Sequence, residues 1–370
     1  MSEKFRSAKT AVIQLDDCDD SLWARFKASE KVPSWMKKVN WPLIFGVIVW
    51  YTLSTTYILQ NKVFVNVVPL HYTCSGFQLI LGAVICLLFW GCGFRAIPRI
   101  TNWRKAVKAF LPLGVCHLIV HYGAVISMAI GDVSATQVIK AGEPVFTAVL
   151  SIIFLRDILN IYAYLSLIPI VVGIGMATFN GLDFAWLPFL YAMISNVGSS
   201  ARAIIAKVTI TNKEEIGQDL TAANIYMILT VISGILSIPL ILVMEAGVWK
   251  EVWEKSTVGM TGWKKTDLLA RALIAALSYY AYNDVAFYCL GQMNQVTHSI
   301  TNTMKRVIVI VFSIIMFNTQ VTWVKGTGMV MAVVGAFVYS LAKQGLFSPK
   351  KPVDIEKKAA SSAEKGPSTV

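Results

Sequence analysis

Charged residues are scarce in this chain. Of its 370 residues only 15% are Asp, Glu, Lys or Arg, whereas 56% are hydrophobic. Soluble domains usually carry about 25% charged residues. The composition therefore excludes a soluble globular protein and predicts an integral membrane protein without a separate soluble domain.

Acidic residues are scarcer than basic ones, with 21 Asp and Glu against 33 Lys and Arg. An excess of this kind can indicate nucleic-acid binding, but the sequence contains no zinc-finger, RNA-binding or basic-zipper signature. A membrane protein gathers Lys and Arg in the loops and tails on one side. We therefore predict a lipid bilayer, and not nucleic acid, as the partner of this chain.

Cysteine and histidine are also sparse. The six cysteines form no CxxC pair, so we interpret them as free thiols that fill apolar space. His117 and His121 are four residues apart, but no carboxylate or thiol ligand follows them closely. The hydrophobic runs lack both the paired Asp residues of magnesium-dependent enzymes and a His–Asp acyl-transfer motif. We expect no metal, no cofactor and no enzymatic activity.

Long hydrophobic runs fill most of the chain. Most exceed the roughly 20 residues that an α-helix needs to cross the hydrocarbon core. They predict an all-α membrane protein with ten transmembrane helices in one domain over 42–345. This domain lies between a tail over 1–41 and a disordered tail over 346–370, which is rich in Lys, Ala, Ser and Glu. The predicted spans are 42–60, 68–91, 110–130, 133–154, 158–178, 185–207, 220–245, 267–290, 294–317 and 322–343.

Two short motifs recur at the same spacing. Ser-Ile-Ile begins at positions 151 and 313, and Val-Val-Gly begins at positions 171 and 333, so that both are shifted by 162 residues. The shift pairs the fourth span with the ninth and the fifth with the tenth. It predicts two five-helix repeats, about 42–180 and 185–345. Because five is odd, the second repeat must be inverted relative to the first, an arrangement that builds alternating access around a midplane site.

The basic residues predict the orientation in the membrane. An even number of spans puts both termini on one side, together with the basic loop 92–109. By the positive-inside rule this side is cytosolic. The loop 246–266 falls on the opposite side, and its tryptophans among lysines indicate a stretch that lies in the membrane interface.

Four cations interrupt the hydrophobic runs, namely Lys140, Arg202, Lys305 and Arg306. On insertion scales each such charge costs roughly 2.5–3.5 kcal/mol at the centre of a helix, so that four cost on the order of 10 kcal/mol. Charges this costly usually bind substrate or ions. The sign of these four favours an anion.

The cations come from spans that the repeat makes partners. Lys140 lies on the fourth span, while Lys305 and Arg306 lie on the ninth. In the repeat register Lys140 matches Asn302, which is about one turn, or roughly 4.5 Å of rise, from Lys305. The cations should therefore face each other at similar depth. Phosphate suits such a site, because arginine can donate two parallel hydrogen bonds to its oxygens and lysine adds a point charge.

Structural roles are the alternative for these residues. Lys140 could pair with Glu143, and Lys305 with an acid such as Asp284. One Glu and one Asp cannot balance four cations, however, so the cavity would remain positive. Arg202 could extend toward the interface, but the small residues before it allow close helix approach and favour a place in the site.

Two further side chains could contact the non-phosphate end of a ligand. His121 lies deeper than His117 and could form a hydrogen bond as a neutral imidazole, and Tyr282 could donate its hydroxyl proton. Either could equally be a satisfied polar group within a helix bundle. Lys62 and Lys343 lie at the ends of predicted spans, where lysine side chains usually reach toward water.

Around these residues the sequence resembles the plastid phosphate translocators, a branch of the drug/metabolite transporter superfamily. The resemblance covers about residues 42–345 and rests on Ile-Lys-Ala-Gly-Glu-Pro at 139–144 and Lys-Arg-Val at 305–307. It implies that the chain is an antiporter that exchanges inorganic phosphate for triose phosphate, 3-phosphoglycerate or phosphoenolpyruvate.

The resemblance also implies roles for the six candidate residues. Those that would hold the phosphate are Lys140, Lys305 and Arg306. Those that would contact the rest of the substrate are His121, Arg202 and Tyr282. After His121 the run Tyr122–Val125 departs from the small hydroxyl residues of plant members, so a contact to the carbon skeleton should differ.

Residues 1–41 contain a cluster of acidic residues, which fits a plastid transit peptide badly. In this the chain resembles family members of the outer membranes of secondary plastids, such as the apicoplast, and we expect such a location. Two rival functions are a nucleotide-sugar transporter of the endoplasmic reticulum or Golgi and a polytopic membrane enzyme acting on lipid phosphates.

Overall fold

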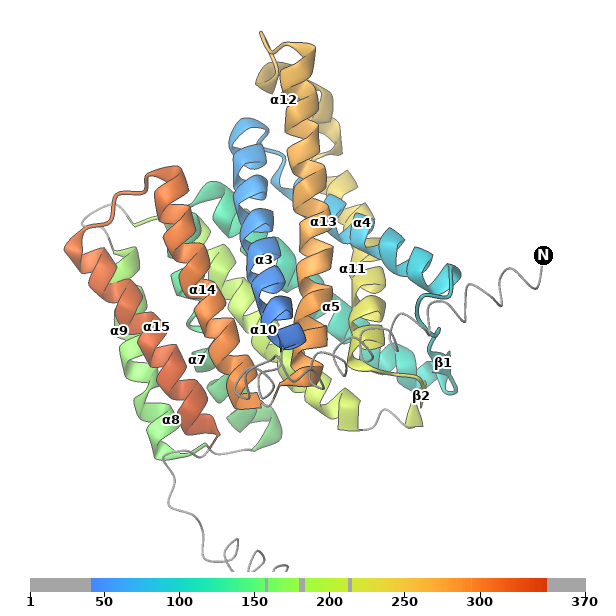
Figure 1. Ribbon diagram of the computed structural model, residues 1–370, viewed down its shortest axis with the longest axis vertical. Helices are drawn as coiled ribbons and strands as arrows, with labels where there is room; N and C mark the ends of the chain where they lie inside the picture. Colours follow the sequence, from blue (N-terminus) through green and yellow to red (C-terminus); the bar gives the residue numbers. More distant parts are fainter. Residues whose placement is uncertain (1–40, 157–158, 180–183, 212–214, 294, 345–370) are drawn as a thin grey trace, which may run out of the picture.

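The computed structural model describes residues 41–156, 159–179, 184–211, 215–293 and 295–344. Within them the chain is almost entirely helical (Figure 1). The predicted tail over 346–370, and that over 1–41 except for Trp41, lie outside the described residues.

Helices occupy each of the predicted spans. They are α3 (Trp41–Val67), α4 (His71–Gly91), α5 (Trp103–Ile130), α6 (Val133–Lys140), α7 (Glu143–Leu150), α8 (Ile161–Leu165), α9 (Leu167–Thr178), α10 (Trp186–Thr211), α11 (Ala222–Met244), α13 (Gly262–Gln292), α14 (Gln295–Phe317) and α15 (Trp323–Lys343). Shorter elements are the strands β1 (Arg99–Ile100) and β2 (Gly217–Gln218), a π-helical turn (Ser151–Leu155), a 3-10 turn (Ala246–Val248) and α12 (Trp249–Ser256).

Eight helical segments in the described part of the chain are long and apolar enough to cross a bilayer. They cover the predicted spans except 185–207 and 267–290. These two are helical as well, as α10 and α13, but polar and charged residues such as Arg202 and Asp284 interrupt their apolar sequence. The chain is therefore an all-α integral membrane protein.

Two predicted spans are interrupted where a continuous helix was expected. The fourth span breaks at Ala141 and Gly142, between α6 and α7. Pro144 has no backbone N–H and cannot donate to the carbonyl of Lys140, so the helix cannot continue unchanged. The fifth span is divided at Ser166, just before Pro169, into α8 and α9. The first of these breaks places Lys140 at a helix end inside the bundle.

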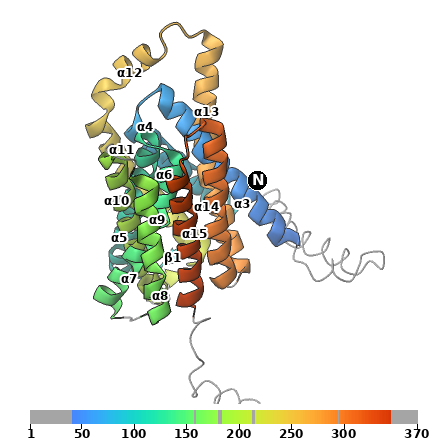
Figure 2. The same ribbon diagram turned by 90° about the vertical axis from the view of Figure 1, so that its left-hand side faces the viewer.

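The helices pack in pairs. The pairs with the most extensive contact are α5 with α10, α3 with α13, α9 with α15, and α4 with α11. Figures 1 and 2 show α9 and α15 side by side along one flank of the bundle. At the end of the bundle where α4 finishes and α11 begins, β1 pairs antiparallel with β2, with Arg99 opposite Gln218. This ribbon ties the segment after α4 to the segment after α10.

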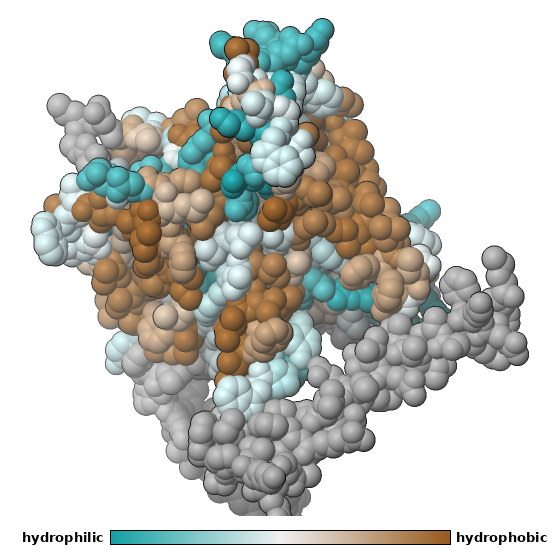
Figure 3. All heavy atoms as spheres, turned by 45° about the horizontal axis from the view of Figure 1, so that its top comes forward, coloured by the Kyte–Doolittle hydropathy of each residue, from teal (hydrophilic) through white to brown (hydrophobic). Residues whose placement is uncertain are grey.

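Large hydrophobic areas cover much of the face of the bundle that Figure 3 shows. Exposed large side chains include Phe45, Ile153, Val243 and Ile315. Such a continuous apolar surface would be unfavourable in water and fits the hydrocarbon of a bilayer. The hydrophilic end of the molecule carries α12 and the start of α13 (Figures 1 and 3).

The loop predicted to lie in the interface folds back on this end of the bundle. The indole N–H of Trp249 donates to Thr73 at 2.7 Å, and Val252 and Trp253 pack against the buried cluster that contains Phe64. The position of this loop at the membrane interface stays a prediction.

Candidate functional site

Two cavities meet inside the bundle, and Lys140 and Arg306 line both of them. The inner cavity, of about 140 Å³, lies among α3, α5, α6, α10, α13 and α14. The outer cavity, of about 550 Å³, lies among α7, α14 and α15. All six residues singled out by the sequence line the inner cavity: Lys140, Arg202, Lys305, Arg306, His121 and Tyr282. The structure thus brings them together, as the repeat register predicts for Lys140, Lys305 and Arg306.

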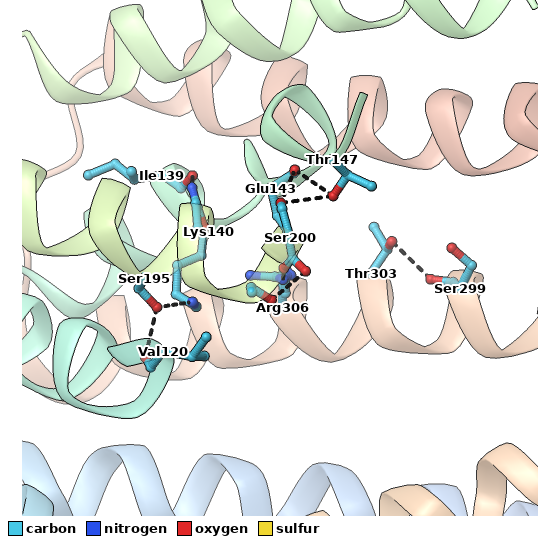
Figure 4. A network of polar contacts seen from close by, with 12 residues as sticks. Val120, Ile139, Lys140, Glu143, Thr147, Ser195, Ser200, Ser299, Thr303 and Arg306 are labelled. Carbon is cyan, nitrogen blue, oxygen red and sulfur yellow. Dashed lines mark hydrogen bonds and ion pairs between the residues drawn. The ribbon is translucent and has the colours of Figure 1, made fainter. Parts of the chain in front are cut away.

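The end of α6 holds Lys140 against α10. Its ammonium donates to Ser195 Oγ at 2.7 Å, and Ser195 donates to the carbonyl of Val120 on α5 at 2.8 Å (Figure 4). The amide of Asn196 donates to the carbonyl of Ile139 at 2.8 Å, which fixes the last turn of α6. Lys140 is therefore positioned by neutral groups.

Glu143 follows the helix break and pairs with Arg306. The Arg306 guanidinium lies 3.2 Å from Glu143 Oε2, and Ser199 on α10 donates to the other carboxylate oxygen at 2.5 Å. The hydroxyls of Thr147 and Ser200 donate to the backbone carbonyl of Glu143 (Figure 4). The carboxylate is thus fixed from two helices.

Both alternative pairings considered from the sequence are wrong. The ion pair of Glu143 is with Arg306, and Lys140 donates to Ser195. Asp284 forms a bidentate ion pair with Arg95, at 2.7 and 2.8 Å, and does not pair with Lys305.

Aromatic rings surround Lys305. Its ammonium lies 5.2 Å from the ring centroid of Trp50 and 5.4 Å from that of Tyr282, within range of cation–π attraction. Tyr57 stacks on Tyr282, and His298 stacks on Trp50. Among the described residues no carboxylate lies within ion-pair distance of Lys305. The rings therefore hold the cation without neutralising it.

Arg202 also lacks a carboxylate partner within the described part of the chain, and it points into the inner cavity. The alternative in which it reaches toward the interface is therefore wrong. Its guanidinium donates to His117 Nδ1 at 2.8 Å. Because arginine is a donor only, Nδ1 must be unprotonated, and His117 is neutral with its proton on Nε2. That nitrogen lies 3.4 Å from the hydroxyl of Tyr279.

His121 is buried and fixed by the backbone of α4. Its Nε2 lies 3.1 Å from the carbonyl of Ser75, to which it must donate, and its ring centroid is 4.2 Å from that of Tyr279. The Tyr282 ring stacks between Tyr57 and the Lys305 ammonium. Both residues therefore form rigid walls of the inner cavity.

Sequence reasoning did not select three residues of this cavity region. His117 and Tyr279 lie one turn before His121 and Tyr282, so helical periodicity could have added them. Trp50 lies among apolar residues of α3, and no local pattern distinguishes it from a lipid-facing side chain. Its contact with Lys305 depends on how α3 packs against α14.

The charges around the two cavities do not balance. Lys140, Arg202, Lys305 and Arg306 bring four positive charges to the inner cavity, and Lys343 also lines the outer cavity. Among the described residues that line either cavity, Glu143 is the one acidic side chain. In a low-dielectric interior like charges repel strongly. The arrangement is therefore suited to an anion of two or more charges that offers several acceptor oxygens.

Comparisons with known proteins agree with this chemistry. The sequence matches the model of the Triose-phosphate Transporter family over residues 42–340. It is 33% identical over 298 residues to phosphoenolpyruvate/phosphate translocator 3, chloroplastic, of Oryza sativa subsp. japonica. The matched residues cover 80% of this chain and 74% of that relative.

Two further relatives are similar to the same extent. Phosphoenolpyruvate/phosphate translocator 1 of Oryza sativa subsp. japonica is 34% identical over 307 residues, with 83% of this chain and 72% of the relative covered. The triose phosphate/phosphate translocator of Pisum sativum is 32% identical over 307 residues, with 83% and 74% covered. From the extent of the family match and these identities, the chain belongs to the Triose-phosphate Transporter family.

Proposed function

We propose that this protein exchanges inorganic phosphate for phosphorylated three-carbon compounds, such as triose phosphate, 3-phosphoglycerate and phosphoenolpyruvate, across a plastid membrane. The observation that carries the proposal is the inner cavity, where four cations meet and, among the described residues, a single carboxylate on the outer-cavity side pairs with one of them. The names of the relatives, which are chloroplastic translocators of phosphate with triose phosphate or phosphoenolpyruvate, support this choice of substrates.

We assign the phosphate group to Lys140, Lys305 and Arg306, which come from facing helices and line one cavity. The remainder of the substrate then lies against Arg202, His121 and Tyr282. An arginine with a free guanidinium edge suits a carboxylate or carbonyl oxygen of a three-carbon compound.

Charge repulsion explains why transport would be an exchange. In the empty state the cavity cations repel one another, and closing both ends would strengthen that repulsion by excluding water. A bound phosphate neutralises much of the charge, so the closed state forms with substrate inside. The carrier would therefore cross loaded and rarely empty.

We further propose ten transmembrane helices in two inverted repeats, α3–α9 and α10–α15. The order of helix packing supports this. When the repeats are exchanged, the contact of α3 with α13 becomes that of α10 with α5, and the contact of α4 with α13 becomes that of α11 with α5. The structure contains all four contacts.

Glycine contacts between α9 and α15 support the repeat register of 162 residues. A Cβ atom at Gly173 would lie 2.5 Å from the backbone N of Ala332, and one at Gly335 would lie 3.0 Å from the backbone N of Ile170. The register relates Gly173 to Gly335 and Ile170 to Ala332, so these two contacts are equivalent by the repeat.

The relatives support a plastid membrane, whereas the finer location is a proposal from sequence alone. The excess of basic residues in the loop 92–109 favours both termini on the cytosolic side. The outer membrane of a secondary plastid stays the prediction drawn from residues 1–41, which lie almost wholly outside the described residues.

Reconstituted vesicles test the proposed exchange. Uptake of labelled phosphate should require internal phosphate or an internal three-carbon phosphate, and vesicles without either should take up little. Rapid uptake into vesicles that contain no exchangeable anion would refute obligatory exchange. A panel of internal anions that includes a nucleotide sugar separates this function from the nucleotide-sugar alternative.

A further inference from the structure

The ion pair between Glu143 and Arg306 lies where the two cavities meet. Glu143 lines the outer cavity and not the inner one, whereas Arg306 lines both. Lys140 and Arg306 line both cavities, so an anion that moves from the outer cavity to Lys305 in the inner cavity passes these two cations, one of which is bound to Glu143.

Glu143 holds the position that an acceptor oxygen of phosphate would take on Arg306. Its carboxylate accepts from the Arg306 guanidinium at 3.2 Å and from Ser199 at 2.5 Å. A guanidinium binds phosphate and carboxylate oxygens through the same donors. Substrate phosphate and Glu143 are thus competitors for one edge of Arg306.

The outer cavity supplies a place for the incoming anion. It is lined by the cations Lys140, Arg306 and Lys343 and by polar side chains such as Asn302 and Thr303. At about 550 Å³ it is larger than the inner cavity, of about 140 Å³. Phosphate can therefore approach Arg306 before it reaches the inner site.

We propose that Glu143 is an internal counter-ion of the unloaded carrier, which the phosphate group entering through the outer cavity displaces from Arg306. In this way Glu143 weakens phosphate binding, lowers repulsion in the empty site, and makes Arg306 exchange one anion for another. The inference rests on the proposed function, since it concerns the same phosphate site.

The test compares E143Q with wild-type protein in phosphate/phosphate exchange. Glutamine can still accept from Ser199 but carries no charge. Removing the competitor should lower the KM for phosphate by about tenfold, equivalent to about 1.4 kcal/mol. D284N is the matched control, because it removes one carboxylate charge from a transmembrane helix outside both cavities. Its KM should equal that of the wild type. An unchanged or higher KM in E143Q would overturn the proposal.

A measurement on folded wild-type protein is independent of whether E143Q folds. The infrared difference spectrum on adding inorganic phosphate should contain a carboxylate band, because Glu143 loses its arginine partner, and D284N should retain this band. Its absence in wild-type protein that binds phosphate would overturn the inference alone. If wild-type protein neither binds nor exchanges phosphate, the proposed function fails with it.

Discussion

Cations at the edges of the bundle and cations at its centre are held in different ways. At the edges Arg95 pairs with Asp284, Lys105 with Glu215, and Arg271 with Asp267. In the inner cavity three of the four cations have no carboxylate partner among the described residues: Lys140 is held by a serine, Arg202 by a histidine, and Lys305 by aromatic rings. The fourth, Arg306, pairs with Glu143.

The difference separates charges that serve the fold from charges that need a ligand. A carboxylate partner neutralises a cation and competes with an anionic substrate, as we propose for Glu143 on Arg306. Neutral partners fix its position and leave its charge available. The distinction should appear in opposite effects of substitution on transport and on stability.

The largest expected effect is at Lys305. Replacing it with Met removes a point charge from the proposed phosphate site, so that phosphate exchange should fall by at least about tenfold to 100-fold, as for loss of a hydrogen bond to a charged group. The melting temperature should stay equal or rise, because an unneutralised buried charge is lost. R271M, at a paired edge cation, is the control for exchange. Normal exchange by K305M would place the phosphate site elsewhere.

Arg95 should show the reverse pattern. R95M leaves Asp284 without its partner in a partly buried position, which should lower the stability by roughly 1–3 kcal/mol. Exchange per folded protein should change little, because Arg95 lines neither cavity. Thermal unfolding in detergent measures this effect. A second substitution, D284N, should recover part of the lost stability, and failure to do so would show that Arg95 acts through other contacts.

A smaller and selective effect is expected at His117, which positions Arg202. H117F removes the acceptor at 2.8 Å, and losing one hydrogen bond of about 0.5–1.5 kcal/mol should raise KM about twofold to tenfold. The KM for three-carbon phosphates should rise more than that for inorganic phosphate, because we assign Arg202 to the part of the substrate beyond its phosphate group. H117N, which keeps an acceptor, should restore part of the affinity. Equal losses for both substrates would contradict this positioning role.

The smallest effect is expected at the exposed pair of Lys105 and Glu215. The hydrogen bond and charge of Lys105 hold the pKa of Glu215 below its usual value. A lowered pKa stabilises the fold at neutral pH, and this contribution disappears as the pH falls through that pKa. Since the pair is exposed, E215Q should change the melting temperature by less than about 1 °C. A larger shift that persists at low pH would show a role beyond this ion pair.

Hydrophobic length was sufficient to predict where the helices lie, because a bilayer requires about 20 apolar residues for each crossing. The same reasoning missed the break after Lys140, although Gly142 and Pro144 were visible in the sequence. Apolar length does not reveal whether a span continues as one helix.

The candidate site was predictable to the extent that charge inside a membrane is costly and the repeat relates its two helices. The sequence therefore predicted that Lys140 and Lys305 would share a cavity. The partners of Glu143 and Lys305 were not predictable, because they depend on the rotation of α3, α7 and α14 about their axes. The partner of Asp284 is Arg95, which lies in a loop that folds back on the bundle. Helical periodicity cannot predict the path of such a loop.

The width of the outer cavity depends on residues that do not line it. Its lining includes Tyr339 and Ser340 of α15. The distance of α15 from α9 depends on Gly173, Gly328 and Gly335, where a Cβ atom would lie 3.0 Å or less from atoms of the opposite helix. Even a methyl group at one of these positions would shift α15 and reshape a chamber that the substituted residue never touches. The size of the outer cavity therefore depends on the contact between α9 and α15 as well as on the residues that line the cavity.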